Sequence, residues 1–369
     1  MKLAIAADWL PTYGGAEHVV AALSVLWPDA PILTTVASKQ SLPPELRRAD
    51  IRVSPLQRVY RFLGRHQFLL PWMPRTMENM DFTGFDAVLS SSHAVGKGVI
   101  PPGDSVHICY CHTPMRYAWE MEAEYLKDFR IKGYLKKRVR AELKRIRRWD
   151  LTTARRVDHF IANSSETQAR IKRIYGRESV VIPPPVDAHF FDSPLITKRE
   201  GYFLAIGRLV PYKRFDLLIE LANTLKLPLK IAGQGSDEAR LKALAGPTVE
   251  FLGFVDEKNL STLYGNAAAL FFPQVEDAGI VPMEAQACGT PIIALGQGGI
   301  IDVVVPGVTG ILAPEQTVTA FTDAVKKFRD THWKYDAIRE HARKFHIDVF
   351  QHKIRTEVES AYARFVSRA

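Results

Sequence analysis

The chain has 369 residues, 47% of them hydrophobic, so it can bury one large core or two ordinary ones, and its length favours two domains. No uncharged apolar run is long enough to span a membrane, and the N-terminus becomes acidic at Asp8, too early for a signal peptide. The three cysteines are sparse and have no metal-ligand spacing. These features argue against an integral membrane protein and a disulfide-rich secreted one, and we expect a cytoplasmic protein.

Short apolar runs alternate with helical patterns along almost the whole chain. In the first half these runs are Leu3–Ala7, Pro31–Val36, Ala87–Ser91, Val106–Tyr110, His159–Asn163 and Val180–Pro183. In the second half they are Tyr202–Ile206, Leu229–Ala232, Val249–Leu252, Ala269–Phe272, Pro291–Ala294 and Gly310–Leu312. Short apolar strands between helices predict parallel sheets that are covered on both faces. The predicted fold class is therefore α/β, with two doubly wound, Rossmann-like domains that bind ligands in a cleft at the carboxyl ends of their strands.

The second series of strands begins again after the proline-rich segment Pro183-Pro184-Pro185-Val186-Asp187. We interpret this segment and the irregular stretch that follows it as a linker. The sequence thus predicts an N-terminal domain over residues 1–183, a second domain over residues 200–348, and a C-terminal helix over residues 349–369 that can pack on the first domain.

The net charge of +9 is concentrated in one segment, because Lys127–Arg156 alone has a net charge of about +10. A smaller basic cluster, Arg58–Arg75, is interleaved with aromatic residues and leucines, and no acid occurs between Asp50 and Glu78. A solvated helical face, a nucleic-acid surface and an anionic membrane surface all remain open for these segments. The sequence has no recognisable nucleic-acid-binding module, so we expect no nucleic-acid partner.

Two motifs of the first domain follow predicted strands. Gly14-Gly15 follows Leu3–Ala7 and begins a helix, where glycines permit a close approach of the backbone to a phosphate or a sugar. The same pair is also compatible with a plain strand–helix turn. His112 follows Val106–Tyr110, and at the end of a strand it can bind a sugar hydroxyl or the reacting centre, or be a core histidine.

The second domain places two cations and two carboxylates in similar positions. Arg208 and Lys213 lie between a strand end and a helix start, where they can neutralise a diphosphate. Glu276 follows the strand Ala269–Phe272, and Glu284 lies about one turn into the next helix. Between the two glutamates are the free amides of the helix N-terminus at Gly279, which form an anion site. Carboxylates that flank a phosphate site suit a nucleotide-sugar.

No Asp-x-Asp pair is available to hold a divalent cation. We therefore expect no metal and no separate cofactor, and stabilisation of the leaving group by cationic side chains and helix dipoles.

These motifs together resemble those of retaining GT-B glycosyltransferases of family 4. The resemblance covers nearly the whole chain and is strongest over residues 201–312. Its motifs are Gly14-Gly15, Gly207-Arg208 with Lys213, Gly233-x-Gly235, Phe251-Leu252-Gly253, the Glu276/Glu284 pair and Ala287-Cys288-Gly289-Thr290-Pro291. Two departures are Ala278, where an aromatic residue is frequent, and Asp302, where glutamate is commoner.

The resemblance implies a role for each matching residue. It places Glu276 on the hydroxyls of the donor sugar, Glu284 on the ribose, and His112 near the anomeric centre, so His112 and Glu276 are the candidate catalytic residues. The diphosphate is expected on Arg208 and Lys213. Backbone atoms of Gly279, Ile280 and Val281 are expected at the phosphate or sugar, and those of Phe254 and Val255 at the base.

A subgroup of bacterial polysaccharide mannosyltransferases is similar around Ser91–Gly98 and His112–Trp119. This similarity implies GDP-mannose as the donor and a lipid-linked (polyprenyl-diphosphate) oligosaccharide as the acceptor, for exopolysaccharide or O-antigen synthesis. We then expect a peripheral protein on the inner face of the cell membrane, attached through Lys127–Arg156 and through Arg58–Arg75, which can form an interfacial helix. Three alternatives stay open: a family 4 transferase with a UDP-sugar donor, a nucleotide-sugar epimerase on the same fold, and a non-catalytic nucleic-acid-binding protein.

Overall fold

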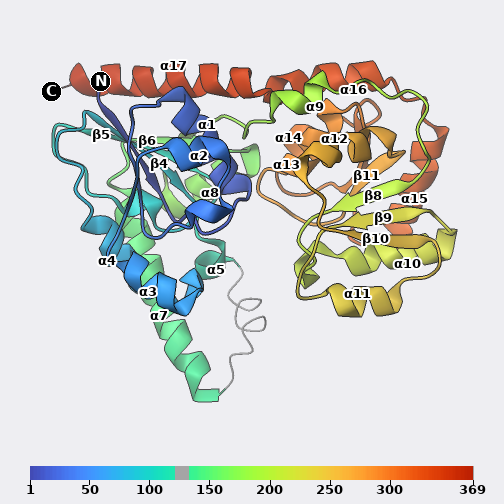
Figure 1. The fold of residues 1–369 in the computed structure, drawn as a ribbon, viewed down its shortest axis with the longest axis horizontal. Coiled ribbons are helices and arrows are strands. Elements are labelled where there is room, and N and C mark those ends of the chain that lie inside the picture. Colours follow the sequence, from blue (N-terminus) through green and yellow to red (C-terminus); the bar gives the residue numbers. More distant parts are fainter. Residues whose placement is uncertain (121–132, 369) are drawn as a thin grey trace. The chain divides into compact units, whose positions relative to one another are not determined.

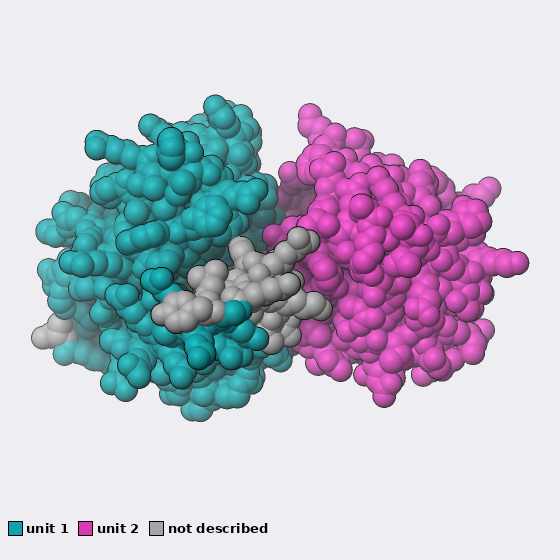
Figure 2. All heavy atoms as spheres, turned by 90° about the horizontal axis from the view of Figure 1, so that it is seen from below, with its two compact units in different colours: residues 1–183, 350–369 teal, residues 184–349 magenta. Residues whose placement is uncertain are grey.

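The computed structural model describes residues 1–120 and 133–368 and divides the chain into two compact units (Figure 2). Unit 1 consists of residues 1–183 and 350–369, and unit 2 of residues 184–349. Each unit is built around its own parallel sheet (Figure 1).

The sheet of unit 1 has seven parallel strands in the order β3-β2-β1-β4-β5-β6-β7. Their bounds are β1 (Leu3–Ala7), β2 (Ile32–Thr34), β3 (Ile51–Val53), β4 (Ala87–Ser92), β5 (Val106–Cys111), β6 (His159–Ala162) and β7 (Ser179–Val181). The helices are α1 (Gly15–Leu26), α2 (Pro44–Arg48), α3 (Leu56–Leu63), α4 (Met73–Glu78), α5 (Arg116–Trp119), α7 (Gly133–Ala154), α8 (Ser165–Tyr175) and α17 (Ile347–Val366), with 3-10 turns η1 (Lys39–Ser41), η2 (His66–Leu69) and η3 (Gly96–Gly98). In the pairing of β1 with β4, the last residue of β1, Ala7, lies opposite Ser91.

Two features of unit 1 differ from the prediction. The structure adds β3, a short edge strand of half-exposed residues with Arg52 at its centre, so its apolar signal is weak. The basic cluster Arg58–Arg75 is not one interfacial helix, because the left-handed Gly64 ends α3 and the chain continues through η2 into α4.

The sheet of unit 2 has six parallel strands in the order β10-β9-β8-β11-β12-β13. Their bounds are β8 (Phe203–Ile206), β9 (Leu229–Ala232), β10 (Val249–Gly253), β11 (Ala269–Phe272), β12 (Ile292–Leu295) and β13 (Gly310–Ala313). The helices are α9 (Ala188–Asp192), α10 (Phe215–Leu225), α11 (Glu238–Leu244), α12 (Glu257–Asn266), α13 (Ile280–Ala287), α14 (Ile300–Val303), α15 (Val318–Asp330) and α16 (Tyr335–Ala342), with 3-10 turns η4 (Pro211–Lys213) and η5 (Arg343–Phe345). The predicted fold class, two doubly wound parallel-sheet units, is confirmed.

Successive residues of the unit 2 strands enter cores on opposite faces of the sheet. In β8, Phe203 and Ala205 lie in one buried cluster and Leu204 lies in the other. Burial of each Leu or Phe side chain contributes roughly 1.5–3 kcal/mol to the stability of the fold. Because both faces are covered, β8, β11 and β12 are apolar at every position, whereas β9 and β10 nearer the edge contain Lys230 and Glu250.

The helix α17 packs on unit 1 from Phe350 onward. The Phe350 ring lies edge-on to Tyr110 of β5, with ring centroids 5.9 Å apart. His159 Nε2 of β6 lies 2.8 Å from the Glu357 carboxylate. An apolar and a polar contact therefore join the C-terminal helix to the middle of this sheet.

Each sheet has one point where the strand order reverses. It lies between β1 and β4 in unit 1 and between β8 and β11 in unit 2. Open α/β sheets bind ligands outside the carboxyl ends of their strands at such switch points. The loops that leave these four strands are therefore the places to look for function.

Candidate active site

An ion pair lies at the switch point of unit 2. Lys213, on η4 after β8, places Nζ 3.0 Å from Oε1 of Glu276, on the loop after β11. The two side chains are 13% and 26% exposed, so both are partly open to solvent. The structure thus brings together a predicted diphosphate ligand and a predicted sugar ligand.

Glycines allow the loops around Lys213 to lie close together. A Cβ on Gly207 would be 3.0 Å from Lys213 Nζ, so the absence of a side chain lets the lysine lie along this backbone. A Cβ on Gly233 would overlap the carbonyl oxygen of Gly207, and one on Gly235 would overlap that of Leu209. The Gly233-x-Gly235 motif therefore sets the distance between the loops after β8 and β9.

A second glycine pair supports the loop that carries Glu276. The Gly299 amide donates to the Glu276 carbonyl oxygen at 2.9 Å. A Cβ on Gly298 would be 2.6 Å from that oxygen, and one on Gly299 would overlap the Asp277 carbonyl oxygen. This pair was not predicted from the sequence to have a role, although two successive glycines after a strand are a signal for close backbone approach.

The helix α13 begins directly after this loop. Its N-cap is Gly279, whose φ of +78° is in the left-handed region. The amides of Ile280 and Val281 are in the first turn and have no intrahelical acceptor, and Pro282 has no N–H. The helix N-terminus for which the sequence predicts an anion site is therefore present, at the start of an eight-residue helix.

Glu284, on the same helix, is oriented by a buried tyrosine. The Tyr264 hydroxyl donates to Glu284 Oε2 at 2.8 Å. Burial, and secondarily the Glu284 charge, raise the pKa of Tyr264 well above its usual value. Tyr264 therefore remains a neutral donor at all ordinary pH values and holds Oε2 of Glu284 in place.

The remaining predicted residues of unit 2 are open to solvent. The Arg208 side chain is exposed, and within residues 1–120 and 133–368 it has no ion pair. Phe254 is 76% exposed after β10, and Val255 is half-buried. The structure does not bring these three side chains into contact with the Lys213–Glu276 pair.

The switch point of unit 1 also carries an ion pair. Asp8, directly after β1, is 2% exposed, and its Oδ2 lies 2.9 Å from Nδ1 of His93, on the loop after β4. The carboxylate accepts from the Ser92 hydroxyl at 3.1 Å, from the amides of His93 at 2.7 Å and Ala94 at 3.1 Å, and from the Gly96 amide. Burial alone raises the pKa of Asp8, but the His93 charge and these hydrogen bonds outweigh it and lower the pKa below its ordinary value.

His112 lies near this pair and is buried. Its Nε2 is 2.8 Å from the Ser91 hydroxyl, and its backbone amide donates to the Ser92 carbonyl at 2.9 Å. Burial, together with the nearby His93 charge, lowers the pKa of His112 to about 3. His112 is therefore neutral near pH 7, so it can exchange hydrogen bonds but cannot supply a positive charge.

Gly14 and Gly15 form the exposed start of α1, with Gly14 in extended backbone. A Cβ on Gly14 would be 3.2 Å from a carboxylate oxygen of Glu17. Burial raises the pKa of Glu17, which lines a small cavity with Asp8 and His93. Gly14 thus has a local packing reason as well as its predicted ligand role.

Asp8 was not among the residues predicted from the sequence to be functional. An acid directly after the first buried strand is a weak signal alone, because its partner is 85 residues away in the sequence. Only the pairing of β1 with β4 places Asp8 beside His93.

One group in the described part of the chain could hold a metal ion. The ligand atoms of Asp187, His189 and Glu257 lie within 4.8 Å of one another in unit 2, and Glu257 is exposed. None of the three is on a loop at the switch point. The expectation of metal-independent chemistry remains a prediction.

The basic segments of unit 1 form a surface that is both charged and apolar. Large apolar side chains are exposed beside the arginines, with Phe62 at 89%, Phe68 at 56% and Trp72 at 60%. The helix α7 extends from the sheet of unit 1 (Figure 1), and its exposed cations are Lys136, Lys137, Arg138, Arg140, Lys144, Arg145 and Arg148. Residues 127–132 of the predicted basic segment lie outside the described residues. None of the described helices is long and apolar enough to cross a membrane.

Asp150 anchors this basic helix to the rest of unit 1. Its carboxylate pairs with buried Lys97 and accepts from Trp119 Nε1 at 2.7 Å and from the Tyr175 hydroxyl at 2.8 Å. These contacts fix the C-terminal half of α7 to unit 1, so the helix that carries the exposed cations is held at that end.

Comparisons with known proteins identify the class of the chain. Residues 13–190 match the family described as Glycosyltransferase Family 4, and residues 187–345 match the family described as Glycosyl transferases group 1. The chain is similar to a D-inositol 3-phosphate glycosyltransferase of Kribbella flavida, 28% identical over 46% of this chain and 47% of that protein. It is also similar to the mouse alpha-1,3/1,6-mannosyltransferase ALG2, 29% identical over 59% of this chain and 58% of that protein. The chain thus spans about half the length of these curated relatives.

The fold agrees with these matches. The structure superposes on Anabaena HepE, solved in complex with UDP, with a TM-score of 0.69 and 17% identity over 98% of this chain and 100% of that chain. The chain therefore belongs to the family 4 glycosyltransferases of GT-B architecture.

Proposed function

We propose that the protein is a retaining, metal-independent mannosyltransferase that uses GDP-mannose and a polyprenyl-diphosphate-linked oligosaccharide. The observation that supports this proposal most directly is the Lys213–Glu276 pair beside the start of α13. A cation, a carboxylate and unpaired helix amides at one switch point match the diphosphate and the sugar hydroxyls of a nucleotide-sugar.

Each residue of this group has a distinct task in the proposal. Lys213 and Arg208 bind the diphosphate, with the amides of Ile280 and Val281 at the α13 N-terminus. When Lys213 turns to the diphosphate, Glu276 is released from the ion pair to bind sugar hydroxyls. Glu284, held by Tyr264, binds the ribose.

Retention follows from attack on the face that the leaving group occupies. The bond from the anomeric carbon to the diphosphate breaks, the bond to the acceptor oxygen forms on the same face, and the acceptor proton passes to a leaving diphosphate oxygen. Neutral His112 is assigned to a hydrogen bond near the anomeric centre. Glu276 binds the sugar and does not act as a nucleophile.

The choice of mannose is supported by the similarity around Ser91–Gly98 and His112–Trp119 and by the mannosyltransferase among the relatives. A UDP-sugar donor is the second candidate, because HepE was solved with UDP. Attachment to the inner membrane surface is supported by the exposed aromatic residues of unit 1 and the cations of α7, each worth about 1 kcal/mol near an anionic surface.

Thermal shift with GDP-mannose, GDP-glucose, UDP-glucose and ADP-glucose tests the donor. We expect the largest stabilisation with GDP-mannose. Stabilisation by the uridine sugar alone would replace the mannosyl proposal with the second candidate, and a protein that no nucleotide-sugar stabilises would contradict both. Conversion of the sugar without an acceptor would indicate an epimerase.

Glu276→Ala tests the site itself. We expect transfer to fall by at least about 100-fold, while GDP binding changes little, because the lost contacts are to the sugar. Glu220→Ala, an exposed glutamate of α10 in the same unit, is the matched control and should keep full activity. A fully active Glu276→Ala enzyme would refute the assignment.

A further inference from the structure

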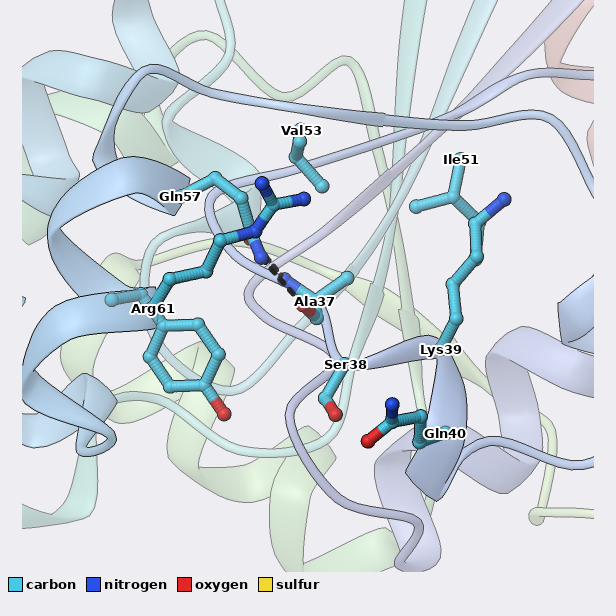
Figure 3. Close-up of a pocket in the computed structure, with 9 residues that line it drawn as sticks. Ala37, Ser38, Lys39, Gln40, Ile51, Val53, Gln57 and Arg61 are labelled. Atoms are coloured by element: carbon cyan, nitrogen blue, oxygen red, sulfur yellow. Dashed lines mark hydrogen bonds between the residues drawn. The ribbon is translucent and has the colours of Figure 1, made fainter.

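A pocket in unit 1 has no role in the function proposed above. It lies between the loop after β2, the edge strand β3 and the helix α3, and its volume is about 420 Å³ (Figure 3). The lining residues are Ala37, Ser38, Lys39, Gln40, Ile51, Val53, Gln57, Tyr60 and Arg61. Ala37 and Lys39 follow a parallel strand at its carboxyl end, where α/β sheets place their ligands.

One side chain joins two walls of the pocket. The Gln57 amide accepts from the Ala37 N–H at 2.8 Å and donates to the Ala37 carbonyl at 2.8 Å (Figure 3). This double hydrogen bond fixes the loop to α3. The walls that carry Lys39 and Arg61 are therefore in place before any ligand binds, which lowers the entropic cost of binding.

The charges of the pocket are of one sign. Lys39 and Arg61 enter from different elements, and no carboxylate lines the pocket. In the described part of the chain neither cation forms an ion pair. The hydroxyls of Ser38 and Tyr60 and the amide of Gln40 add hydrogen-bond donors. Two uncompensated cations with several donors match a phosphate group.

Apolar side chains continue from one side of the pocket. Val53 lines both this pocket and a second one of about 640 Å³, whose lining combines the apolar Leu33, Leu56, Val59 and Met80 with the polar Arg52, Ser54, Thr76, Asn79 and Asp81. A soluble phosphate would gain nothing from these apolar side chains, whereas the hydrocarbon of a lipid would cover them.

We infer that this pocket binds the phosphate of a lipid phosphate ester whose hydrocarbon chain lies along α3. The inference rests on the proposed lipid-linked acceptor and deepens it, by giving the phosphate end of such a lipid a specific site in unit 1. General attraction of the α7 cations to an anionic surface does not require this pocket, so the two can be separated by experiment.

The test measures binding to phosphatidylcholine vesicles that contain either a polyprenyl phosphate or phosphatidylglycerol, adjusted to equal surface potential. Arg61→Gln should weaken binding about fivefold on phosphatidylglycerol, as expected for one cation near a membrane. On polyprenyl phosphate the loss should be at least about tenfold greater, because a charge-assisted phosphate contact is also removed.

Two further variants sharpen the result. Arg58→Gln removes the same charge from α3 outside the pocket, and it should weaken binding to both vesicles equally. Gln57→Ala changes no charge but releases the loop, so it should lower binding to polyprenyl phosphate only. Equal losses on both vesicles for Arg61→Gln, or no effect of Gln57→Ala in a protein that melts normally, would overturn the inference.

A soluble competitor separates the sources of phosphate. Glycerol phosphate at millimolar concentration should not displace the polyprenyl phosphate vesicles, and complete displacement would mean that the pocket binds soluble phosphates instead. Stabilisation by GDP-mannose should be the same in wild type and Arg61→Gln. If GDP-mannose fails to stabilise the wild type while lipid selectivity persists, the proposed function fails and the phosphate site remains.

Discussion

The two units carry an ion pair at the same topological position, but they hold it in opposite ways. In unit 1 the Asp8 carboxylate is buried and bound by backbone amides, and only His93 reaches solvent. In unit 2 both Lys213 and Glu276 are partly exposed, and glycine-rich backbone surrounds them. The first pair is therefore part of the folded framework. The second can open, so each partner can bind a ligand.

The largest expected effect compares the two carboxylates directly. Asp8→Ala leaves several buried amides and the Ser92 hydroxyl without an acceptor, and it should lower the free energy of unfolding by about 3–5 kcal/mol. Glu276→Ala removes half of a partly exposed pair and should cost about 0–1 kcal/mol. Urea unfolding of both variants measures the difference, and similar losses would show that the two pairs are not held differently.

The next prediction concerns the backbone around the unit 2 pair. In Gly299→Ala the new methyl group overlaps the Asp277 carbonyl oxygen, so the loop that carries Glu276 must move. We expect a loss of about 1–3 kcal/mol in the free energy of unfolding, and weaker nucleotide-sugar binding. Gly103→Ala is the control, because nothing lies within 4 Å of its Cβ and its φ is ordinary. If the affinity for the nucleotide-sugar is unchanged in Gly299→Ala, this backbone contact is not needed for donor binding.

The two sites also differ in how far the sequence alone predicted them. The apolar strands and the residues directly after them could be predicted from the sequence, because buried parallel strands and glycine turns have local sequence patterns. This was enough to predict the two-unit fold and to select Lys213 and Glu276. The Asp8–His93 pair was missed because it depends on which strands are neighbours, and β3 was missed because an exposed edge strand has little apolar signal. The division of Arg58–Arg75 into α3, η2 and α4 is set by the turn at Gly64, and the alternation of arginines with apolar residues did not predict it.

The buried histidines of unit 1 predict a difference in acid sensitivity. Burial lowers the pKa of His107 and of His112 to about 3 in the folded protein, whereas the unfolded chain binds these protons near pH 6.5. The unfolded state then binds more protons as the pH falls, so folding stability is lost on acidification from about 6.5 toward 3. Between pH 7 and 6 the loss should be on the order of 1–2 kcal/mol.

Hydrogen exchange with mass spectrometry at several pH values can follow each unit separately. Peptides of β4 and β5 should lose protection before those of β11 and β12. His112→Gln should flatten the pH dependence, while His352→Gln, an exposed histidine of α17, should leave it unchanged. Equal loss of protection in both units would contradict the assignment of acid sensitivity to unit 1.

The smallest effect tests a part of the unit 2 site that is built from a buried side chain. Tyr264→Phe removes the hydroxyl that donates to Glu284 and should cost about 1 kcal/mol of stability. If Glu284 binds the ribose, its freer carboxylate should raise the dissociation constant for the nucleotide by roughly 3- to 10-fold, with little change in kcat. Tyr202→Phe is a matched control, because its hydroxyl donates to the Leu263 carbonyl at 2.7 Å in the same unit. It should show a similar loss of stability with no loss of nucleotide affinity. Equal nucleotide affinities in the two variants would mean that Tyr264 only stabilises the fold. The geometry of the unit 2 site would then depend on backbone contacts and not on this buried side chain.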